Sequence, residues 1–418
     1  MKRWIPYMLA IAATVPWFAI SFGGLAHPPA GLTALATGGG ILAAAFLLGW
    51  ACEVAEMDVP AALAVSVLAL VAVLPEYAVD ATFAWKAAHD KQQASYAIAN
   101  MTGGNRLLLG TGWSLLLGLS WYRFKAKEIV LPKDMGVEIT ILIAATLYAL
   151  VPVWRGSLTL VDTAVYLVLY VSYLIAAARC EEHEGEVVGP ARVMAELPKF
   201  WRRFGVIACL VYAATFIFVA AEPFAESLVQ SGEQLGVDQF FLVQWVAPVA
   251  SESPEVLVSV LMVMRGASQQ GLRTLVSSNV NQWTLLVGTL AAVYSVSKGE
   301  PGELHMDDRQ RVEVLLTAAQ CVFAIAAIAD LRFALWQGGV LTGLFALQFL
   351  LPHGLVAPVA AMLPEGHVRE VFGTPHAIIS FFYLAFATFV IVVDKRSRDG
   401  VGESIRTFWA KFRGVESS

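Results

Sequence analysis

The segment Ala250-Ser251-Glu252-Ser253-Pro254-Glu255 places two carboxylates beside a proline inside an otherwise apolar stretch. A second Pro-Glu step, Pro75-Glu76, lies within an apolar stretch in the first half of the chain. A carboxylate at the centre of a bilayer costs roughly 2.5–3.5 kcal/mol to insert, so such residues mark functional sites. A neighbouring proline leaves backbone carbonyls available to a cation. One step in each half therefore indicates a duplicated ion site.

The composition indicates a membrane protein. Of 418 residues, 58% are hydrophobic and only 15% are charged, whereas about 25% of the residues in a soluble domain are charged. Apolar runs long enough to cross a bilayer recur along the whole sequence. These runs are too long and too uniformly apolar for the alternating strands of a β-barrel. The net charge of −5 and the scattered basic residues give no indication of nucleic-acid binding.

We expect an all-α membrane protein of about twelve transmembrane helices, each of roughly 20 residues, which is the length that a bilayer requires. The segment 333–351 gives the weakest signal, because Arg332 crowds its start. The expected spans are residues 4–22, 33–52, 60–87, 94–121, 136–153, 158–179, 204–223, 239–265, 271–297, 311–330, 333–351 and 372–393.

Lysine and arginine residues in the loops predict the orientation of the bundle. With twelve spans, the three basic regions fall on one side, and the loop 224–237, which has no lysine or arginine, falls on the other. We therefore expect an integral protein of the plasma (inner) membrane with both termini in the cytoplasm. The basic residues are Arg123, Lys125, Lys127 and Lys133, then Arg192, Lys199, Arg202 and Arg203, then Lys395, Arg396, Arg398, Arg406, Lys411 and Arg413.

The two halves of the chain match each other when Pro75 is aligned with Pro254. Each Pro-Glu step is followed by a basic residue and then by a second helix with a cluster of small and amide residues, Asn100–Asn105 in one half and Ser277–Gln282 in the other. The loops 88–93 and 266–270 fall on opposite sides of the membrane, so the repeats are inverted. Inverted repeats with broken helices that meet at the midplane are typical of alternating-access transporters.

This pattern predicts five regions along the chain. Two of them are the repeats, and the other three are an extra helix at each end and a cytoplasmic linker between the repeats. The regions are 1–32 for the extra N-terminal helix, 33–180 for the first repeat, 181–203 for the linker, 204–351 for the second repeat, and 352–418 for the extra C-terminal helix and cytoplasmic tail.

The second half resembles the second α-repeat of the sodium/calcium exchanger family, within the cation/Ca²⁺ antiporter superfamily. That family has a Gly-Thr-Ser-x-Pro-Glu break, an Arg-Gly turn and a Gly-Ser-Asn helix. Here these elements read Ala250–Glu255, Arg265-Gly266 and Ser277-Ser278-Asn279. The first half is a weaker match, through Asn100-x-x-Gly103-Gly104-Asn105. The similarity covers residues 41–121 and 220–297, and it implies a ten-helix core with one extra helix at each end.

The resemblance implies a site for hard cations, which take oxygen ligands. Glu76 and Glu255 would be the two central acids. Two facing glutamates hold a divalent ion when ionised and take up protons when the ion leaves, because repulsion and burial disfavour two bare charges. The other positions that match family ligands are the main-chain oxygens of Ala72 and Ser251 and the side chains of Ser251, Glu252, Ser278 and Gln282. The transported cations, Ca²⁺, Na⁺ or H⁺, would be the substrates, and no cofactor is expected.

Three asparagines near the site have two readings. Asn100, Asn105 and Asn279 either bind the ion or hydrogen-bond the open backbone of the facing broken helix, which needs internal partners in lipid. For Asn105 and Asn279 the sequence favours the structural role.

The first repeat departs from the family pattern. It has Val71-Ala72-Val73 in place of Gly-Thr-Ser, and Leu108 in place of a polar residue. These changes weaken the case for several bound Na⁺ ions and favour a proton-coupled or single-ion exchanger.

Further charged residues lie near the two steps. Asp80 shares a helical face with Glu76, and Glu252 shares one with Glu255, so each is expected to join the site. The alternative for Asp80 is that it faces a polar cavity or pairs with a cation. Arg106 has three readings: a built-in cation that occupies the ion site, a partner of Asp80 or Glu252, or a structural ion pair away from the ion path.

The sequence therefore predicts a secondary antiporter, and not an enzyme, that exchanges Ca²⁺ or a related cation for H⁺ or Na⁺. Its partners are the lipid bilayer and inorganic cations. One alternative is a non-transporting or altered-specificity member with Arg106 in the ion site. A remote alternative is an intramembrane hydrolase with Glu76 and Glu255 as its acid/base pair. The inverted repeat argues against a hydrolase, as does the lack of a GxGD-like, HExxH or GxSxG motif.

Overall fold

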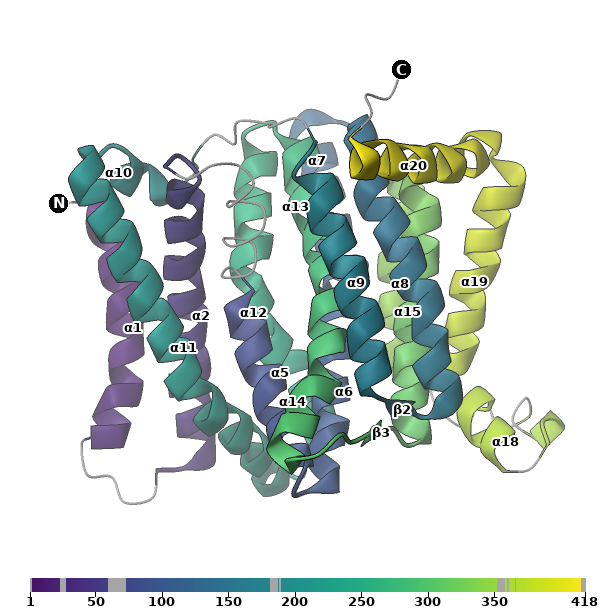
Figure 1. Ribbon diagram of the computed structural model, residues 1–418, viewed down its shortest axis with the longest axis horizontal. Helices are drawn as coiled ribbons and strands as arrows, with labels where there is room; N and C mark the ends of the chain where they lie inside the picture. Colours follow the sequence, from purple (N-terminus) through teal and green to yellow (C-terminus); the bar gives the residue numbers. More distant parts are fainter. Residues whose placement is uncertain are drawn as a thin grey trace. The chain divides into compact units, whose positions relative to one another are not determined.

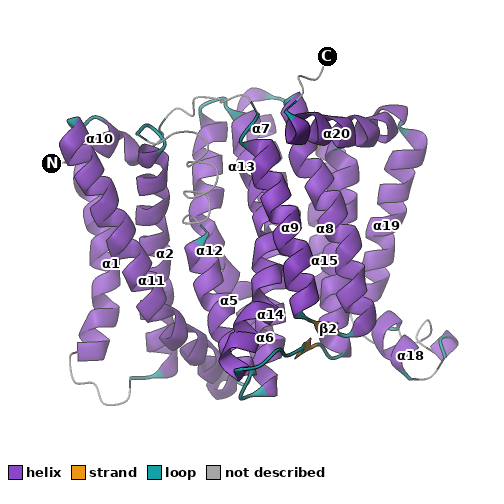
Figure 2. Ribbon diagram, viewed as in Figure 1, coloured by secondary structure: helices purple, strands orange, loops and turns teal. Residues whose placement is uncertain are grey.

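The computed structural model describes residues 2–22, 28–58, 73–180, 187, 189–351, 358, 361–364 and 366–414. These residues are almost entirely helical (Figures 1 and 2). The strands among them form two short two-stranded ladders. The helices are α1 Ile5–Phe22, α2 Ala30–Ala55, α5 Leu74–Ala87, α6 Lys91–Leu107, α7 Trp113–Phe124, α8 Gly136–Arg155, α9 Leu160–Ala177, α10 Ala191–Ala195, α11 Lys199–Leu235, α12 Gln239–Met264, α13 Ser268–Asn281, α14 Val287–Lys298, α15 Asp308–Ile328, α16 Leu335–Leu350, α18 His367–Phe372, α19 Pro375–Val393 and α20 Lys395–Arg413. Short 3₁₀ turns, η1 Lys2–Trp4 and η4 Lys133–Met135, precede α1 and α8.

The expected all-α membrane fold is confirmed. Within the described ranges, eight helices are long and apolar enough to cross a bilayer: α1, α2, α8 with η4, α9, α11, α12, α15 and α19. The expected spans 94–121 and 271–297 each correspond to two helices joined without interruption by a π-helical turn. The span 333–351 corresponds to the shorter apolar helix α16. Of the span 60–87, the described part is residues 73–87, which include α5.

The chain divides into two compact units, Met1–Phe83 with Glu181–Leu261, and Ala84–Cys180 with Met262–Ser418. Each unit takes part of both sequence repeats. We call them the first and second unit and describe each by itself.

In the first unit, α2 packs along the long helix α11. Close approach depends on glycines, because small residues let membrane helices pack tightly. A Cβ atom built on Gly40 would lie 2.7 Å from Cε1 of Phe216, and one on Gly38 would lie 2.8 Å from Cε2 of Phe224. Helix α1 also packs against α2, and the ring centres of Tyr7 on α1 and Trp50 on α2 lie 5.0 Å apart.

A bidentate ion pair joins the end of α2 to the start of α11. Arg202 Nε donates to Asp58 Oδ2 at 2.9 Å, and its Nη2 donates to Oδ1 at 3.0 Å. The hydrogen bonds from Arg202 hold the pKa of the Asp58 carboxyl below its usual value. This pair therefore contributes stability that is lost as the pH falls through that lowered pKa.

The second unit has α15 at its centre. Of the apolar part of this helix, 83% is buried, the largest share among the eight candidate spans. Helix α15 packs against α8, α19 and α6. A helix that is apolar on every side is typical of the interior of a bundle.

Two antiparallel ladders in the second unit show that the repeats are inverted. Strand β1 (Glu128–Val130), between α7 and α8, pairs with β4 (Arg332–Ala334), between α15 and α16. Strand β2 (Ser157–Leu158), between α8 and α9, pairs with β3 (Leu304–His305), between α14 and α15. In the sequence alignment the α7–α8 connection corresponds to the α14–α15 connection. These two connections belong to different ladders, and the ladders lie at opposite ends of α8. Equivalent connections of the two repeats therefore lie at opposite ends of the second unit, as inversion requires.

Two π-helical turns support the alignment of the repeats in detail. They are η3 (Leu108–Gly112) and η5 (Gln282–Leu286). Each begins three residues after an aligned asparagine, Asn105 or Asn279, and each is followed by a helix of 12 residues. The π-helical turns in membrane-embedded helices often occur at functional sites.

The contact between α2 and α11 leads to a stability prediction. We expect Gly40→Ala to destabilise the protein by about 1–3 kcal/mol, because the new methyl group overlaps the buried ring of Phe216. Gly39→Ala is the matched control, since nothing lies within 4 Å of its Cβ position. Thermal unfolding of the purified protein in detergent measures both. Equal melting temperatures for the two variants would contradict this packing.

Candidate cation site

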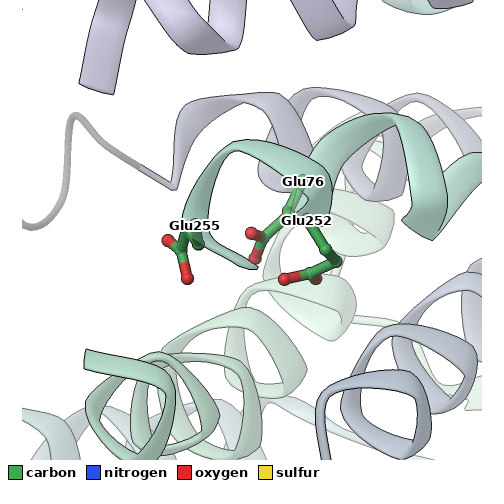
Figure 3. Close-up of side chains that lie close together, drawn as sticks. All are labelled: Glu76, Glu252 and Glu255. Carbon is green, nitrogen blue, oxygen red and sulfur yellow. The ribbon is translucent and has the colours of Figure 1, made fainter. Parts of the chain in front are cut away.

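Three carboxylates from two helices gather in the first unit. Glu76 lies in the first turn of α5, and Glu252 and Glu255 lie on α12. One oxygen from each lies within 4.8 Å of the others. Figure 3 shows the carboxylate of Glu76 between those of the two α12 residues in that view. Glu76 is 3% exposed and Glu252 is 2% exposed, whereas Glu255 is half-buried.

The local sequence explains how these side chains are positioned. Pro75 is the second residue of α5, where a helix needs no backbone N–H donor. Glu76 follows it in the first turn, where the helix dipole favours a negative charge. Glu252 and Glu255 are three residues apart and so share one face of α12.

Helix α12 continues past Pro254 to Met264. The interruption that the sequence suggested at this step is therefore limited to a missing hydrogen bond. Pro254 has no N–H, so the carbonyl of Ala250 lacks its usual donor within the helix. An electronegative oxygen is thereby left one turn before Glu255.

Three ionised carboxylates cannot share this place without compensation. At 4.8 Å, each pair of charges repels by about 3 kcal/mol for an effective dielectric constant of about 20. Burial adds a further penalty for each ionised group. A hard cation with oxygen ligands or a set of bound protons relieves both costs. The cluster is therefore suited to hold either a cation or protons.

Other expected residues of the first unit lie beside the cluster along the chain. Asp80, one turn after Glu76, is 1% exposed. The Ser251 hydroxyl lies 3.4 Å from the carbonyl oxygens of Ala247 and Pro248. Ala72 lies outside the described residues.

The structure adds Ser259, which the sequence analysis did not single out. This residue follows Glu252 by seven positions, so it lies on the same face of α12. Its side chain is fully buried, and its Oγ has no hydrogen-bond partner among the described residues. In the repeat alignment it corresponds to Asp80, and that correspondence was the signal available in the sequence.

The remaining expected ligands belong to the second unit. They lie on α6 (Asn100 and Asn105), on α13 (Ser278 and Asn279) and at the start of η5 (Gln282), and all are buried.

The contacts of these residues differ. Asn105 Nδ2 donates to the carbonyl of Met101 at 3.1 Å, and Asn279 Oδ1 accepts from Trp113 Nε1 at 3.0 Å. These contacts favour structural roles for both amides. The Oγ of Ser278 has no hydrogen-bond partner within the described ranges.

Arg106 makes an ion pair within the second unit. Its Nη2 lies 2.5 Å from Oε2 of Glu313 on α15, and its Nη1 donates to Gln348 Oε1 at 3.0 Å. The other carboxylate oxygen of Glu313 lies 3.1 Å from His376 Nδ1. Of the three readings of Arg106, these contacts favour the structural ion pair.

A second ion pair, which is partly buried, also joins the two repeats. Arg273 on α13 lies 2.9 Å from Asp134 and 4.0 Å from Glu138 on α8. Thus Arg106 of the first repeat pairs with a glutamate of the second, and Arg273 of the second pairs with acids of the first. The sequence analysis missed these pairs because more than a hundred residues separate the partners.

Comparison of the chain with models of known protein families identifies its family. The model of the sodium/calcium exchanger protein family matches residues 28–178 and 205–352, one segment in each repeat. The chain belongs to the sodium/calcium exchanger family. Its members are transporters, so the general activity of this exchanger is cation/Ca²⁺ antiport.

Solved structures support the fold of the exchanger. One described as an H⁺/Ca²⁺ exchanger CAX is 37% identical, covers 99% of this chain and 99% of its own, and gives a TM-score of 0.88. A structure of native YfkE is 15% identical, covers 82% of this chain and 97% of its own, and gives a TM-score of 0.58, so it supports the fold alone. No match was found among curated proteins.

The ion pair of Arg106 leads to a second prediction. Replacing Arg106 by Ile removes the guanidinium that neutralises buried Glu313, which costs about 3–5 kcal/mol. We expect a lower melting temperature and an unchanged Ca²⁺ affinity. The double variant Arg106→Ile/Glu313→Met, which removes both charges, should recover most of the loss. Tighter Ca²⁺ binding by Arg106→Ile in equilibrium titration would instead place the guanidinium in the ion site.

Proposed function

We propose that this exchanger transports Ca²⁺ in one direction and protons in the other by alternating access, with Glu76, Glu252 and Glu255 as the shared binding groups. The observation that carries the proposal is the cluster itself, with three carboxylates within 4.8 Å of one another and two of them almost fully buried. A bound cation or bound protons lower the electrostatic cost of such a cluster.

The chemistry of the ligands supports Ca²⁺. This ion takes six to eight oxygen ligands from carboxylates, carbonyls and hydroxyls in flexible geometry. The first unit offers three carboxylates, the Ala250 carbonyl left by Pro254, and the buried hydroxyl of Ser259. We propose that Asp80 and Ser251 support this set, whereas Asn100, Ser278 and Gln282 of the second unit stay predictions from the sequence.

Three considerations support protons as the coupling ion. Leu108 stands where the family has a polar residue, and Val71-Ala72-Val73 stands where it has Gly-Thr-Ser, so ligands for additional Na⁺ ions are fewer. The 37% identical relative, which the chain matches over 99% of both lengths, is described as an H⁺/Ca²⁺ exchanger. Finally, two protons replace one Ca²⁺ without changing the net charge of the cluster.

We further propose the orientation that the basic loops indicate, with both termini in the cytoplasm of a plasma (inner) membrane. The inverted repeats provide two related halves, each of which can open the site to one side. A non-transporting protein with Arg106 in the ion site is less consistent with the ion pair between Arg106 and Glu313.

Ion fluxes in proteoliposomes test the proposal. Purified protein should take up Ca²⁺ against an imposed pH gradient, and the pH inside the vesicles should change in step. An equal Na⁺ gradient at constant pH should drive little uptake. Uptake driven by Na⁺ alone would overturn proton coupling, and no flux of Ca²⁺, Na⁺ or H⁺ would overturn transport.

Substitutions in the cluster should reduce this flux strongly. We expect Glu76→Gln and Glu255→Gln each to lower Ca²⁺ uptake at least a hundredfold, because an amide oxygen replaces an ionised ligand; about 3 kcal/mol of lost binding corresponds to that factor. Glu233→Gln, an exposed position on α11, is the matched control and should retain parental uptake. Parental rates in Glu255→Gln would exclude the cluster as the transport site.

The apparent Ca²⁺ affinity should rise with pH. Carboxylate ligands bind Ca²⁺ in the ionised form, so protons compete with the metal and the dissociation constant falls as they leave. We expect a fall of up to about a hundredfold for each pH unit where two protons are displaced, measured by equilibrium Ca²⁺ binding in detergent. A dissociation constant independent of pH between 5 and 9 would contradict competition at this site.

A further inference from the structure

The helix α20, which directly follows the apolar helix α19, is firmly attached to the second unit. Its buried residues recur at helical spacing and are mostly small: Ser397, Gly400, Ser404 and Phe408. A Cβ atom on Gly400 would overlap the carbonyl group of Ala329 at the end of α15. One on Gly136, at the start of α8, would lie 2.9 Å from Cα of Ser404. These close approaches hold the helix across the ends of the bundle helices (Figure 1).

The last turn of α20 is also fixed. The guanidinium of Arg179, just beyond α9, donates to the carbonyl oxygens of Lys411, at 3.0 Å, and of Phe412. A cation at the carboxyl end of a helix satisfies its open carbonyls and complements the dipole. Helix α20 is therefore a built part of this end of the protein.

A second face of α20 is apolar and partly exposed, with two of its four side chains exposed and two half-buried. It contains Val401, Ile405, Trp409 and Phe412, which are three or four residues apart and so form one flank beside the buried stripe. Ile405 is 38% exposed and Trp409 is 46% exposed. Tryptophan with aliphatic residues on one flank is typical of a helix that lies in the membrane interface. Because α19 ends at Val393 and α20 begins at Lys395, α20 starts at the boundary of the bilayer.

The remaining face of α20 is basic. Its exposed cations outnumber its two exposed acids, Asp399 and Glu403. The guanidinium of Arg413 lies 5.4 Å from the ring centre of Trp409, so charge and apolar surface adjoin directly. The exposed basic residues are Lys395, Arg396, Arg398, Arg406 and Arg413.

The connection between α7 and α8 extends this surface. Its 3₁₀ turn η4 contacts α20, so the two segments lie at the same end of the second unit. Exposed aromatic residues again accompany the charges, since Nζ of Lys125 lies 5.5 Å from the ring centre of Trp121 and 5.9 Å from that of Tyr122. The exposed basic residues here are Arg123, Lys125, Lys127 and Lys133.

We propose that these two segments form a binding surface for anionic phospholipids of the adjacent leaflet. The apolar flank of α20 enters the boundary between headgroups and acyl chains, and the basic residues bind the phosphate groups. The preference for basic residues on one side of a membrane accounts for cations in short loops. It does not account for a docked helix that presents Ile405 and Trp409 beside them.

Short-chain lipids and the full-length protein in detergent test this surface. The probes are dioctanoyl phosphatidylglycerol, dioctanoyl phosphatidylcholine and inorganic phosphate, and the readout is the shift in melting temperature. We expect the anionic lipid to act at a concentration at least tenfold lower than the neutral lipid. Inorganic phosphate should give no shift, because it has no acyl chain. Added salt at 0.5 M should weaken the effect of the anionic lipid.

A charge variant and a matched control make the test specific. Arg398→Gln/Arg406→Gln/Arg413→Gln should weaken binding of the anionic lipid by about a hundredfold, roughly fivefold for each charge. The control Lys91→Gln/Lys298→Gln/Arg309→Gln removes three exposed cations at the opposite end and should bind as the parent does. Ile405→Ser/Trp409→Ser should weaken both lipids. Parental binding in the charge variant, or a shift with phosphate alone, would overturn the proposal.

Discussion

The main physical constraint on this structure is the free-energy cost of placing three carboxylates together in an apolar interior. Glu76, Glu252 and Glu255 have oxygens within 4.8 Å of one another, and two of these side chains are almost fully buried. Repulsion and burial each amount to several kcal/mol, which is comparable with the total stability of many proteins. Compensating positive charge, from a cation or from bound protons, lowers this cost. This compensation couples the departure of a cation to the arrival of protons, and it makes the same groups suitable for exchange.

The rest of the chain provides a scaffold with two related halves. In the second unit, the β1–β4 and β2–β3 ladders join connections of different repeats at opposite ends of α8. Two ion pairs also cross between the repeats: the buried pair of Arg106 with Glu313, and the partly buried pair of Arg273 with Asp134 and Glu138. A buried pair is strongly destabilising when one partner is lost, so these contacts constrain how the repeats pack. The charges of Arg106 and Glu313 are thus neutralised within the scaffold.

Much of this organisation could be predicted from the sequence, because it depends on local signals. Long apolar runs identified the helices, and the Pro-Glu steps with their following Asn clusters identified the repeats. The roles of Glu76 and Glu255 as central acids stay predictions. The partner of Arg106 could not be predicted, since Glu313 is more than two hundred residues away and no periodic pattern connects them. The π-helical turns η3 and η5 were also missed, because an extra residue in a helical turn leaves the apolar pattern almost unchanged. Ser259 was overlooked because a lone serine in an apolar helix is usually a packing residue; its alignment with Asp80 was the signal in the sequence, and its burial without a hydrogen-bond partner among the described residues strengthens it.

The number of protons released when Ca²⁺ binds tests the central claim most directly. It can be measured by calorimetric titration of the purified protein in buffers that differ in their enthalpy of ionisation. The account predicts that about two protons leave for each Ca²⁺ bound at mildly acidic pH, and that the release disappears when Glu76 and Glu255 are both replaced by Gln. Ca²⁺ binding without any release of protons over the whole pH range would contradict the claim that this cluster exchanges a cation for protons.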